Sequence, residues 1–252
     1  MSRFTAFAIH LGISVAIFLA LLMVIVFIWY PGVYFATDGG WQGIRLIAAI
    51  DVVLGPLLTL IVFRSGKPGL RRDLTIIGIV QTAALSFGIW IVHSERPVLV
   101  VFAHDRFVTL NREQVARAED RAIAMVKQAE RLPEYAYVRL PEDAKGLNDI
   151  TRQALRIGKL PYLLGDRYEY LGPANVPVIL RYAVDIERLV KDKPADQERL
   201  QAFIQNHAGA LADYTFVPLK GRYKLILFAF AHKNLRPLGP LDIDSSDLVS
   251  SF

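Results

Sequence analysis

Three long apolar segments occupy the first 92 residues of the chain. No residue from Phe4 to Tyr30 carries a fixed charge, and a helix of that length rises about 40 Å, more than the roughly 30 Å hydrocarbon core of a bilayer. Two further apolar segments run over residues 44–63 and 74–92. The pattern predicts three transmembrane helices, at about residues 4–30, 44–63 and 74–92.

The first segment does not have the form of a cleaved signal peptide. A signal peptide has an apolar core of only about 7–15 residues. The segment also ends in Trp29-Tyr30-Pro31, an aromatic pair suited to the membrane interface and then a helix breaker. We therefore expect residues 1–92 to be a permanent transmembrane anchor.

Positive charge is distributed unevenly between the loops. Four of the ten residues 64–73 are basic, whereas residues 31–43 contain no Lys or Arg. Because basic residues collect in cytoplasmic loops, the asymmetry predicts a multi-pass protein of the bacterial inner membrane with a cytoplasmic N-terminus. The third helix would then deliver residues 93–252 to the extracytoplasmic side, the periplasm of a Gram-negative cell.

Beyond residue 92 the apolar runs are short and alternate with charged positions. Strand patterns are expected at 98–103, 107–110, 135–140 and 177–184, and in a closing hairpin of 214–219 and 223–231. Helical periodicity marks 112–131, 149–157 and a stretch after Pro194. The final strand is apolar on both faces, so we expect it to be central. Irregular alternation of helix and strand favours α+β.

The predicted fold is therefore a membrane protein in which three N-terminal transmembrane α-helices precede an extracytoplasmic α+β domain. That domain is expected over residues 93–234. Residues 235–252 contain Pro and Gly and then a run of Ser and Asp, which predicts a loosely held C-terminal tail.

Charge and cysteine content exclude several classes of function. The first 92 residues hold six basic and three acidic side chains, which leaves 23 basic and 21 acidic for the rest. This near balance does not form the dense basic patch of a nucleic-acid-binding domain. The chain has no cysteine, which excludes disulfides, thiolate metal sites and thiol catalysis.

No constellation of residues indicates catalysis. The soluble histidines, His93, His104, His207 and His232, are isolated along the sequence, whereas a metal site needs converging ligands. Nucleophile-elbow, phosphate-loop and dinucleotide motifs are missing from the sequence. We expect no catalytic residue, no metal, no cofactor and no small-molecule substrate.

Two ionisable residues fall within the second apolar segment. Arg45 lies at its outer end and can extend to the interface, whereas Asp51 lies about 10 Å deep, where a carboxylate needs a partner. Gly55 and Pro56 follow, and the proline should bend the helix beside Asp51. Gln81 of the third segment has a comparable depth. Two interpretations remain open: a hydrogen bond that only assembles the helices, or a functional contact.

Small residues recur every fourth position in two of the spans. They are Ala8, Gly12, Ala16 and Ala20 in the first, and Gly78, Thr82 and Ser86 in the third. Such faces allow close approach of helices in lipid. They indicate either packing within the chain or a groove for the helix of another protein.

Three stretches carry a resemblance to a known family. They are residues 51–63 (DVVLGPLLTLIVF), the Lys67-Pro68 turn, and residues 96–107, which begin with RPVLVVF and end with DRF. Over about residues 45–120 the chain resembles the TfpX/TfpZ family of type IV pilin accessory proteins. The motif residues present, all without assigned roles, are Asp51, Gly55, Pro56, Arg96, Pro97, Asp105, Arg106 and Phe107.

The resemblance implies a non-enzymatic, chaperone-like accessory of type IV pilus assembly that binds or stabilises a particular pilin or assists its assembly. Its partners would be a pilin or the assembly machinery, together with membrane lipid. Pilins of this class carry an acidic residue near the start of their membrane helix, which makes Asp51, Arg45 and Gln81 candidate contacts. An extracytoplasmic sensor working through a membrane partner is the alternative, and a membrane enzyme is a third reading that no residue constellation supports.

Overall fold

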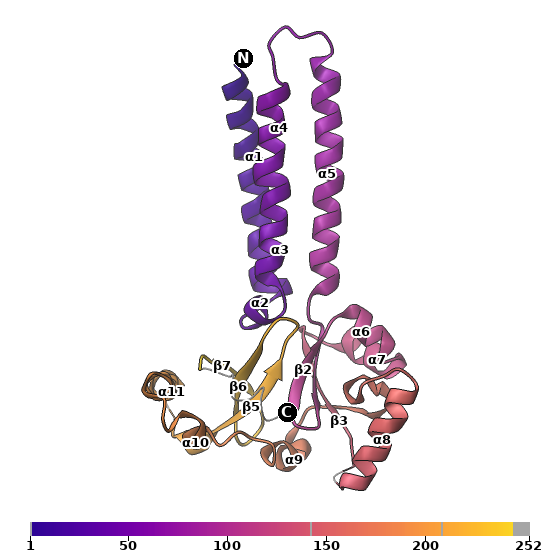
Figure 1. The fold of residues 1–252 in the computed structure, drawn as a ribbon, viewed down its shortest axis with the longest axis vertical. Coiled ribbons are helices and arrows are strands. Elements are labelled where there is room, and N and C mark those ends of the chain that lie inside the picture. Colours follow the sequence, from indigo (N-terminus) through magenta and orange to yellow (C-terminus); the bar gives the residue numbers. More distant parts are fainter. Residues whose placement is uncertain (1, 142, 208, 244–252) are drawn as a thin grey trace. The chain divides into compact units, whose positions relative to one another are not determined.

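The computed structural model describes residues 2–141, 143–207 and 209–243. Its internal contacts divide the chain into a helical unit, Met1–Arg96, and a sheet unit, Pro97–Phe252. The first unit extends four residues beyond the expected anchor, because the third long helix continues to Glu95. Each unit is described by itself (Figure 1).

The helical unit contains three helices that are long and apolar enough to cross a membrane, at Arg3–Trp29, Gly40–Val62 and Leu70–Glu95. The first consists of α1 (Arg3–Val24) and the π-helical η1 (Ile25–Trp29). The second consists of α3 (Gly40–Ile47), the π-helical η2 (Ala48–Leu54) and α4 (Gly55–Val62), and the short α2 (Tyr34–Thr37) precedes it. The third is α5 (Leu70–Glu95). The expected segments are thus confirmed as helices, and the second and third each begin four residues earlier than predicted.

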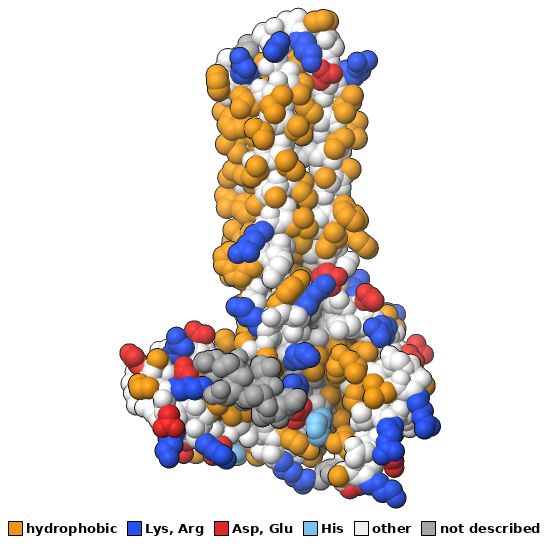
Figure 2. All heavy atoms as spheres, viewed as in Figure 1, with side chains coloured by type: hydrophobic (Ala, Val, Ile, Leu, Met, Phe, Trp, Pro, Cys, Tyr) orange, Lys and Arg blue, Asp and Glu red, His pale blue; other side chains and the backbone are white. Residues whose placement is uncertain are grey.

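The surface of the helical unit is apolar along most of its length, and Lys and Arg gather at the end formed by the turn between α4 and α5 (Figure 2). Ile61 and Ile79 are 65% and 64% exposed. Polar side chains such as Ser14 and Thr59 are buried instead. This distribution is the one expected of helices that cross a membrane.

The sheet unit is built on seven strands. These are β1 (Leu99–Ala103), β2 (Arg106–Leu110), β3 (Glu134–Val138), β4 (Tyr168–Tyr170), β5 (Tyr214–Lys220), β6 (Leu225–Ala231) and β7 (Pro237–Leu241). Their order is β4-β3-β1-β2-β5-β6-β7. The pairs β1–β3 and β2–β5 are parallel and the others antiparallel, so the sheet is mixed, as the α+β prediction requires.

Helices lie beside both halves of the sheet (Figure 1). They are α6 (Arg112–Arg117), α7 (Asp120–Gln128), α8 (Ala144–Arg156), α9 (Val176–Leu180), α10 (Ile186–Val190) and α11 (Pro194–His207), with 3₁₀ turns η3 (Pro161–Leu163), η4 (Gly165–Arg167), η5 (Pro173–Asn175) and η6 (Leu211–Asp213).

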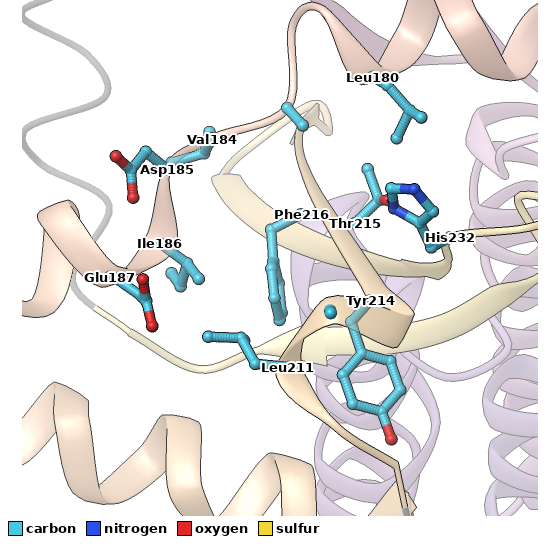
Figure 3. A pocket seen from close by; sticks show the side chains of 12 residues that line it. Leu180, Val184, Asp185, Ile186, Glu187, Leu211, Tyr214, Thr215, Phe216 and His232 are labelled. Carbon is cyan, nitrogen blue, oxygen red and sulfur yellow. The ribbon is translucent and has the colours of Figure 1, made fainter.

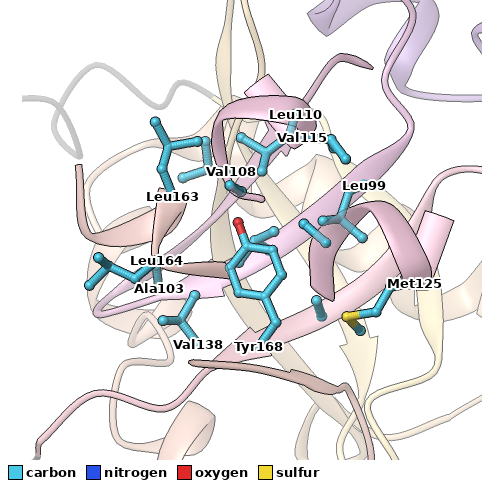
Figure 4. Close-up of a cluster of buried hydrophobic side chains, with 14 of the residues drawn as sticks. Leu99, Ala103, Val108, Leu110, Val115, Met125, Val138, Leu163, Leu164 and Tyr168 are labelled. Carbon is cyan, nitrogen blue, oxygen red and sulfur yellow. The ribbon is translucent and has the colours of Figure 1, made fainter. Parts of the chain in front are cut away.

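Two apolar clusters of described residues contribute to the core of this unit. One lies around β1, β2 and β3 with α6 and α7 (Figure 4), and the other joins β5, β6 and β7 to α10 and α11. Tyr168 is fully buried in the first cluster and its hydroxyl donates to the carbonyl oxygen of Tyr162. Burial raises the pKa of the Tyr168 phenol well above its usual value, so this donor stays protonated.

The helix predicted over 112–131 is wrong as a single element. It divides into α6 and α7 at Glu119, whose φ is 72°. At this junction Gly165 approaches the carbonyl of Ala118 so closely that a Cβ atom would lie 1.8 Å from its oxygen. Both helices bury the same apolar cluster, which is why the periodicity gives no sign of the break.

The strand predicted over 177–184 is also wrong, because residues 176–180 form the helix α9. Pro177 lies in the first turn of that helix, where its missing N–H costs no hydrogen bond. Five apolar residues suit either structure, and only Ile179 among them is buried.

The expected tail is corrected in part. Residues 237–241 form β7, which pairs with β6, and Leu241 and Ile243 are buried. Because β7 covers β6, the apolar strand predicted to be central indeed has a neighbour on each side. Residues 244–252 of the predicted tail lie outside the described residues.

Candidate functional site

Asp51 lies where the second span departs from regular α-helix. Residues Ala48–Leu54 are π-helical, and α4 begins at Gly55 with Pro56 in its first turn. Proline has no N–H to offer to the carbonyl four residues before it, and π-helical turns relieve such mismatches in hydrogen bonding. Asp51 therefore lies in a π-helical turn next to Pro56, and the bend expected there stays a prediction.

The carboxyl group of Asp51 is held by side chains from two other helices. It is 2% exposed. Its Oδ1 accepts hydrogen bonds from Gln81 Nε2 at 2.7 Å and from Ser14 Oγ at 3.2 Å. The predicted proximity of Gln81 is thus confirmed, and the three side chains connect α1, η2 and α5.

Two oxygen atoms of this cluster have no hydrogen-bond partner among the described residues. They are Asp51 Oδ2 and Gln81 Oε1, both buried. Each is an acceptor when the aspartate is ionised, and a buried acceptor without a hydrogen-bond donor is costly. The cluster therefore lacks a hydrogen-bond donor.

Gly55 is required for the close approach of α4 to α5. A Cβ atom at Gly55 would lie 2.2–2.4 Å from three atoms of the Gln81 carboxamide. Any larger residue must displace Gln81 and with it the bond to Asp51. Gly55 thus contributes to the same cluster as Asp51 by leaving room for the Gln81 side chain, and it has no side chain of its own that could form a hydrogen bond.

A second polar pair continues the cluster along α1 and α4. His10 Nδ1 and Thr59 Oγ1 are 2.6 Å apart. His10 lies one helical turn before Ser14, and Thr59 lies about two turns after Asp51. We call these five residues the polar row: His10, Ser14, Asp51, Thr59 and Gln81. Sequence reasoning missed three of them, although His10 and Ser14 stand four residues apart in an otherwise apolar helix.

A cavity of about 250 Å³ lies between α1, α4 and α5 next to the polar row. Its lining residues are Ala6, Ile9, His10, Ile13, Thr59, Phe63, Leu74, Ile77 and Gly78. No atom lies within 4 Å of a Cβ built at Gly78 or at Gly12. These two glycines of the predicted small-residue faces therefore have open space beside them.

Arg45 does not join the polar row. Its guanidinium carbon lies 6.0 Å from the centre of the Trp41 ring, and the side chain is exposed. No described basic residue forms an ion pair with Asp51. This agrees with the interfacial interpretation of Arg45.

The motif residues from Arg96 onward have local structural contacts. Arg106 makes a two-bond ion pair with the neighbouring Asp105, at 2.9 Å and 2.7 Å, at the turn between β1 and β2. Phe107 is fully buried and stacks on Phe230 with ring centres 4.7 Å apart. Arg96 donates to the backbone oxygen of His93 at 2.9 Å, and Pro97 begins the sheet unit.

A second cavity, of about 500 Å³, lies in the sheet unit beside β5 and α10 (Figure 3). Phe216, Leu211 and Ile186 give it an apolar wall, and Thr215 Oγ1 lies 3.0 Å from His232 Nδ1. The size suits a small ligand or a peptide side chain. No group of three or more potential metal ligands was found among the described residues.

Comparison with known proteins finds similarity to three fimbrial assembly proteins of Dichelobacter nodosus. The chain is 36% identical over 110 residues to the protein of serogroup E1, and 34% identical over 110 residues to those of serogroup I and of serogroups C1 and C2. Each match covers 42% of this chain. It covers 42% of the first two relatives and 83% of the third.

The chain thus spans less than half the length of the first two relatives that it matches. No family model matches the sequence. No solved structure matches it either.

Proposed function

The chain belongs to the family of fimbrial assembly proteins represented in Dichelobacter nodosus, and we propose that it is a non-enzymatic inner-membrane accessory of type IV pilus biogenesis. The resemblance to the TfpX/TfpZ family points to the same process. Within it, we assign the chain the task of binding and stabilising a pilin before assembly.

The observation that carries this proposal is the cavity between α1, α4 and α5 beside the polar row. Helices in lipid associate through close packing at small residues and through hydrogen bonds between polar side chains. The cavity offers both, because Gly78 lines it with open space and His10 and Thr59 contribute polar atoms.

The partner that fits is the membrane helix of a pilin. An acidic side chain on that helix, when protonated, is a hydrogen-bond donor, and a donor is what Asp51 Oδ2 and Gln81 Oε1 lack. Both oxygens are buried in the isolated chain, so binding would include a movement of the Gln81 side chain.

Substitutions at Asp51 test the role of the polar row in piliation. Asp51→Leu removes the acceptor of Ser14 and Gln81, whereas Asp51→Asn keeps one acceptor and adds a donor. We expect Asp51→Leu to leave the protein in the membrane at normal abundance and to lower surface piliation, and Asp51→Asn to have a milder effect. The control is Ala83→Leu, which changes an exposed residue two positions after Gln81 and outside the small-residue face of Gly78 and Thr82.

Crosslinking tests the partner directly. A photoreactive residue at Ile77, which lines the cavity, should crosslink to a pilin in whole membranes, and Gly78→Leu should abolish the product by filling the cavity. Gly12→Leu, also free of contacts within 4 Å, is the matched control. Normal piliation with Asp51→Leu, or crosslinks that contain no pilin, would refute the proposal.

A further inference from the structure

The turn between β5 and β6 lies at a defined edge of the sheet. Leu99 at the start of β1 pairs with Leu110 at the end of β2. Because β2 and β5 run parallel, with Val108 opposite Lys220, residues 221–224 continue past the sheet on the edge where β1 begins. Two strand spacings, about 10 Å, separate β1 from β5 along that edge.

The short connection between α5 and β1 limits the distance between this edge and the end of the third span. Only three residues lie between Glu95, the last residue of α5, and Leu99, the first of β1, so four residue steps join the two. Four residues extend over at most about 14 Å. If α5 spans the bilayer, the start of β1 therefore lies within that distance of the end of α5, whatever path the intervening residues take.

The residues of this turn have the composition of a membrane-interface segment. Lys220, Arg222 and Lys224 are exposed, and no acidic residue occurs between them. Tyr223 at the tip is 49% exposed and lies beside the guanidinium of Arg222, 5.5 Å from ring centre to carbon. Tyrosine is enriched at the level of the headgroups, and basic clusters attract anionic lipids.

A shallow cavity of about 310 Å³ opens among these side chains. Its lining residues are Arg106, Lys220, Gly221, Arg222, Tyr223, Lys224 and Leu225. None of them is acidic, and the charge of Arg106 is already paired with Asp105. The hollow therefore suits a negatively charged group approached mainly by the two lysines.

We propose that the β5–β6 turn binds the headgroups of anionic phospholipids at the membrane surface where α5 ends. The contact anchors the sheet unit at a second point besides the chain connection. It is independent of the pilin proposal, because it involves neither the polar row nor the cavity among the helices.

The opposite edge of the sheet supplies an internal control. Lys233 lies in the turn between β6 and β7, next to Ala231, which pairs with Tyr214 at the far end of β5. Lys233 is exposed, so its amine should react with a water-soluble acylating reagent under all conditions. It differs from Lys220 and Lys224 mainly in the edge that it occupies.

The test measures acylation of each lysine in the full chain, reconstituted in nanodiscs and analysed by peptide mass spectrometry. We expect Lys220 and Lys224 to be protected several-fold in discs containing phosphatidylglycerol compared with discs of phosphatidylcholine alone, while Lys233 changes little. High salt should weaken the protection, because it screens exposed charges. Lys224→Glu should reduce the protection of Lys220, and Lys233→Glu should not.

Three results would overturn the proposal. The first is equal acylation of Lys220 and Lys224 in the two kinds of disc. The second is equal protection of Lys233, which would indicate only general attraction of the protein to a charged surface. The third is full protection by inorganic phosphate in phosphatidylcholine discs, which would indicate a site for a free anion.

Discussion

The helical unit exposes large apolar side chains and buries several polar ones, whereas the core of the sheet unit is mainly apolar. In the helical unit Ser14, Asp51 and Thr59 are buried while Ile61 and Ile79 face outward. In the sheet unit every residue of β1 is buried, whereas the charged side chain of Arg139, paired with Glu169, is 74% exposed.

This difference is expected if lipid surrounds the helical unit and water surrounds the sheet unit. Apolar side chains gain nothing from burial when lipid already surrounds them, so close packing and hydrogen bonds must hold the helices together. In water the burial of apolar surface is the main driving force. The informative residues are therefore the polar ones in the first unit and the closely packed ones in the second.

The experiment with the largest expected effect uses reporter fusions to test whether only the helical unit lies in the membrane. A reporter fused after residue 69 should behave as cytoplasmic and one fused after residue 150 as exported, because the 64–73 turn carries the basic residues. The two reporters should give all-or-none differences in activity. A fusion after residue 150 that stays in the cytoplasm would contradict the three-span topology.

Within the sheet unit the largest effect is expected from Gly165→Ala. The new Cβ would lie 1.8 Å and 2.8 Å from backbone atoms of Ala118, which cannot move without shifting α6 or α7. Overpacking of this kind costs typically about 1–3 kcal/mol and sometimes more, and we expect the upper end. Thermal unfolding followed by circular dichroism measures it.

Gly172→Ala is the matched control for that substitution. Nothing lies within 4 Å of a Cβ at Gly172, so its change in stability should stay within about 0.5 kcal/mol. Equal effects of the two substitutions would show that close packing at Gly165 is not what stabilises the unit.

A smaller effect is expected from Gly55→Ala in the helical unit. The methyl group displaces the Gln81 carboxamide and breaks its hydrogen bond to Asp51. Such bonds between membrane helices contribute about 0.6 kcal/mol on average and up to about 1.7 kcal/mol. Denaturation of the bundle in detergent should show a loss in this range, and Gly12→Ala, which meets no neighbour, should show none.

The smallest effect is expected from Arg139→Ala. Its side chain is 74% exposed in the ion pair with Glu169, and exposed pairs contribute roughly 0.2–1 kcal/mol. We expect a loss of about 0.5 kcal/mol or less that disappears at high salt. A loss as large as that of Gly165→Ala would remove the distinction between packing and surface charge in the sheet unit.

The sequence alone was sufficient for the features that depend on neighbours along the chain. Apolar length predicted the three long helices, and comparable depth in two spans made Gln81 a candidate partner of Asp51, which the hydrogen bond between them confirms. The hairpin of β5 and β6 and the helix after Pro194 also follow their local patterns. In each case the signal is a period or a length that the residues themselves carry.

Only the tertiary structure decided the features that depend on distant partners. Residues 177–180 have the composition of a strand but form a helix, and β7 becomes a strand because β6 offers it a free edge. Ser14 joins Asp51 across 37 residues, and the basic turn 221–224 reaches the edge where β1 begins through the pairing of β2 with β5. A sequence pattern indicates which side chains of a segment can be buried or form hydrogen bonds. The rest of the fold determines which partner the segment contacts.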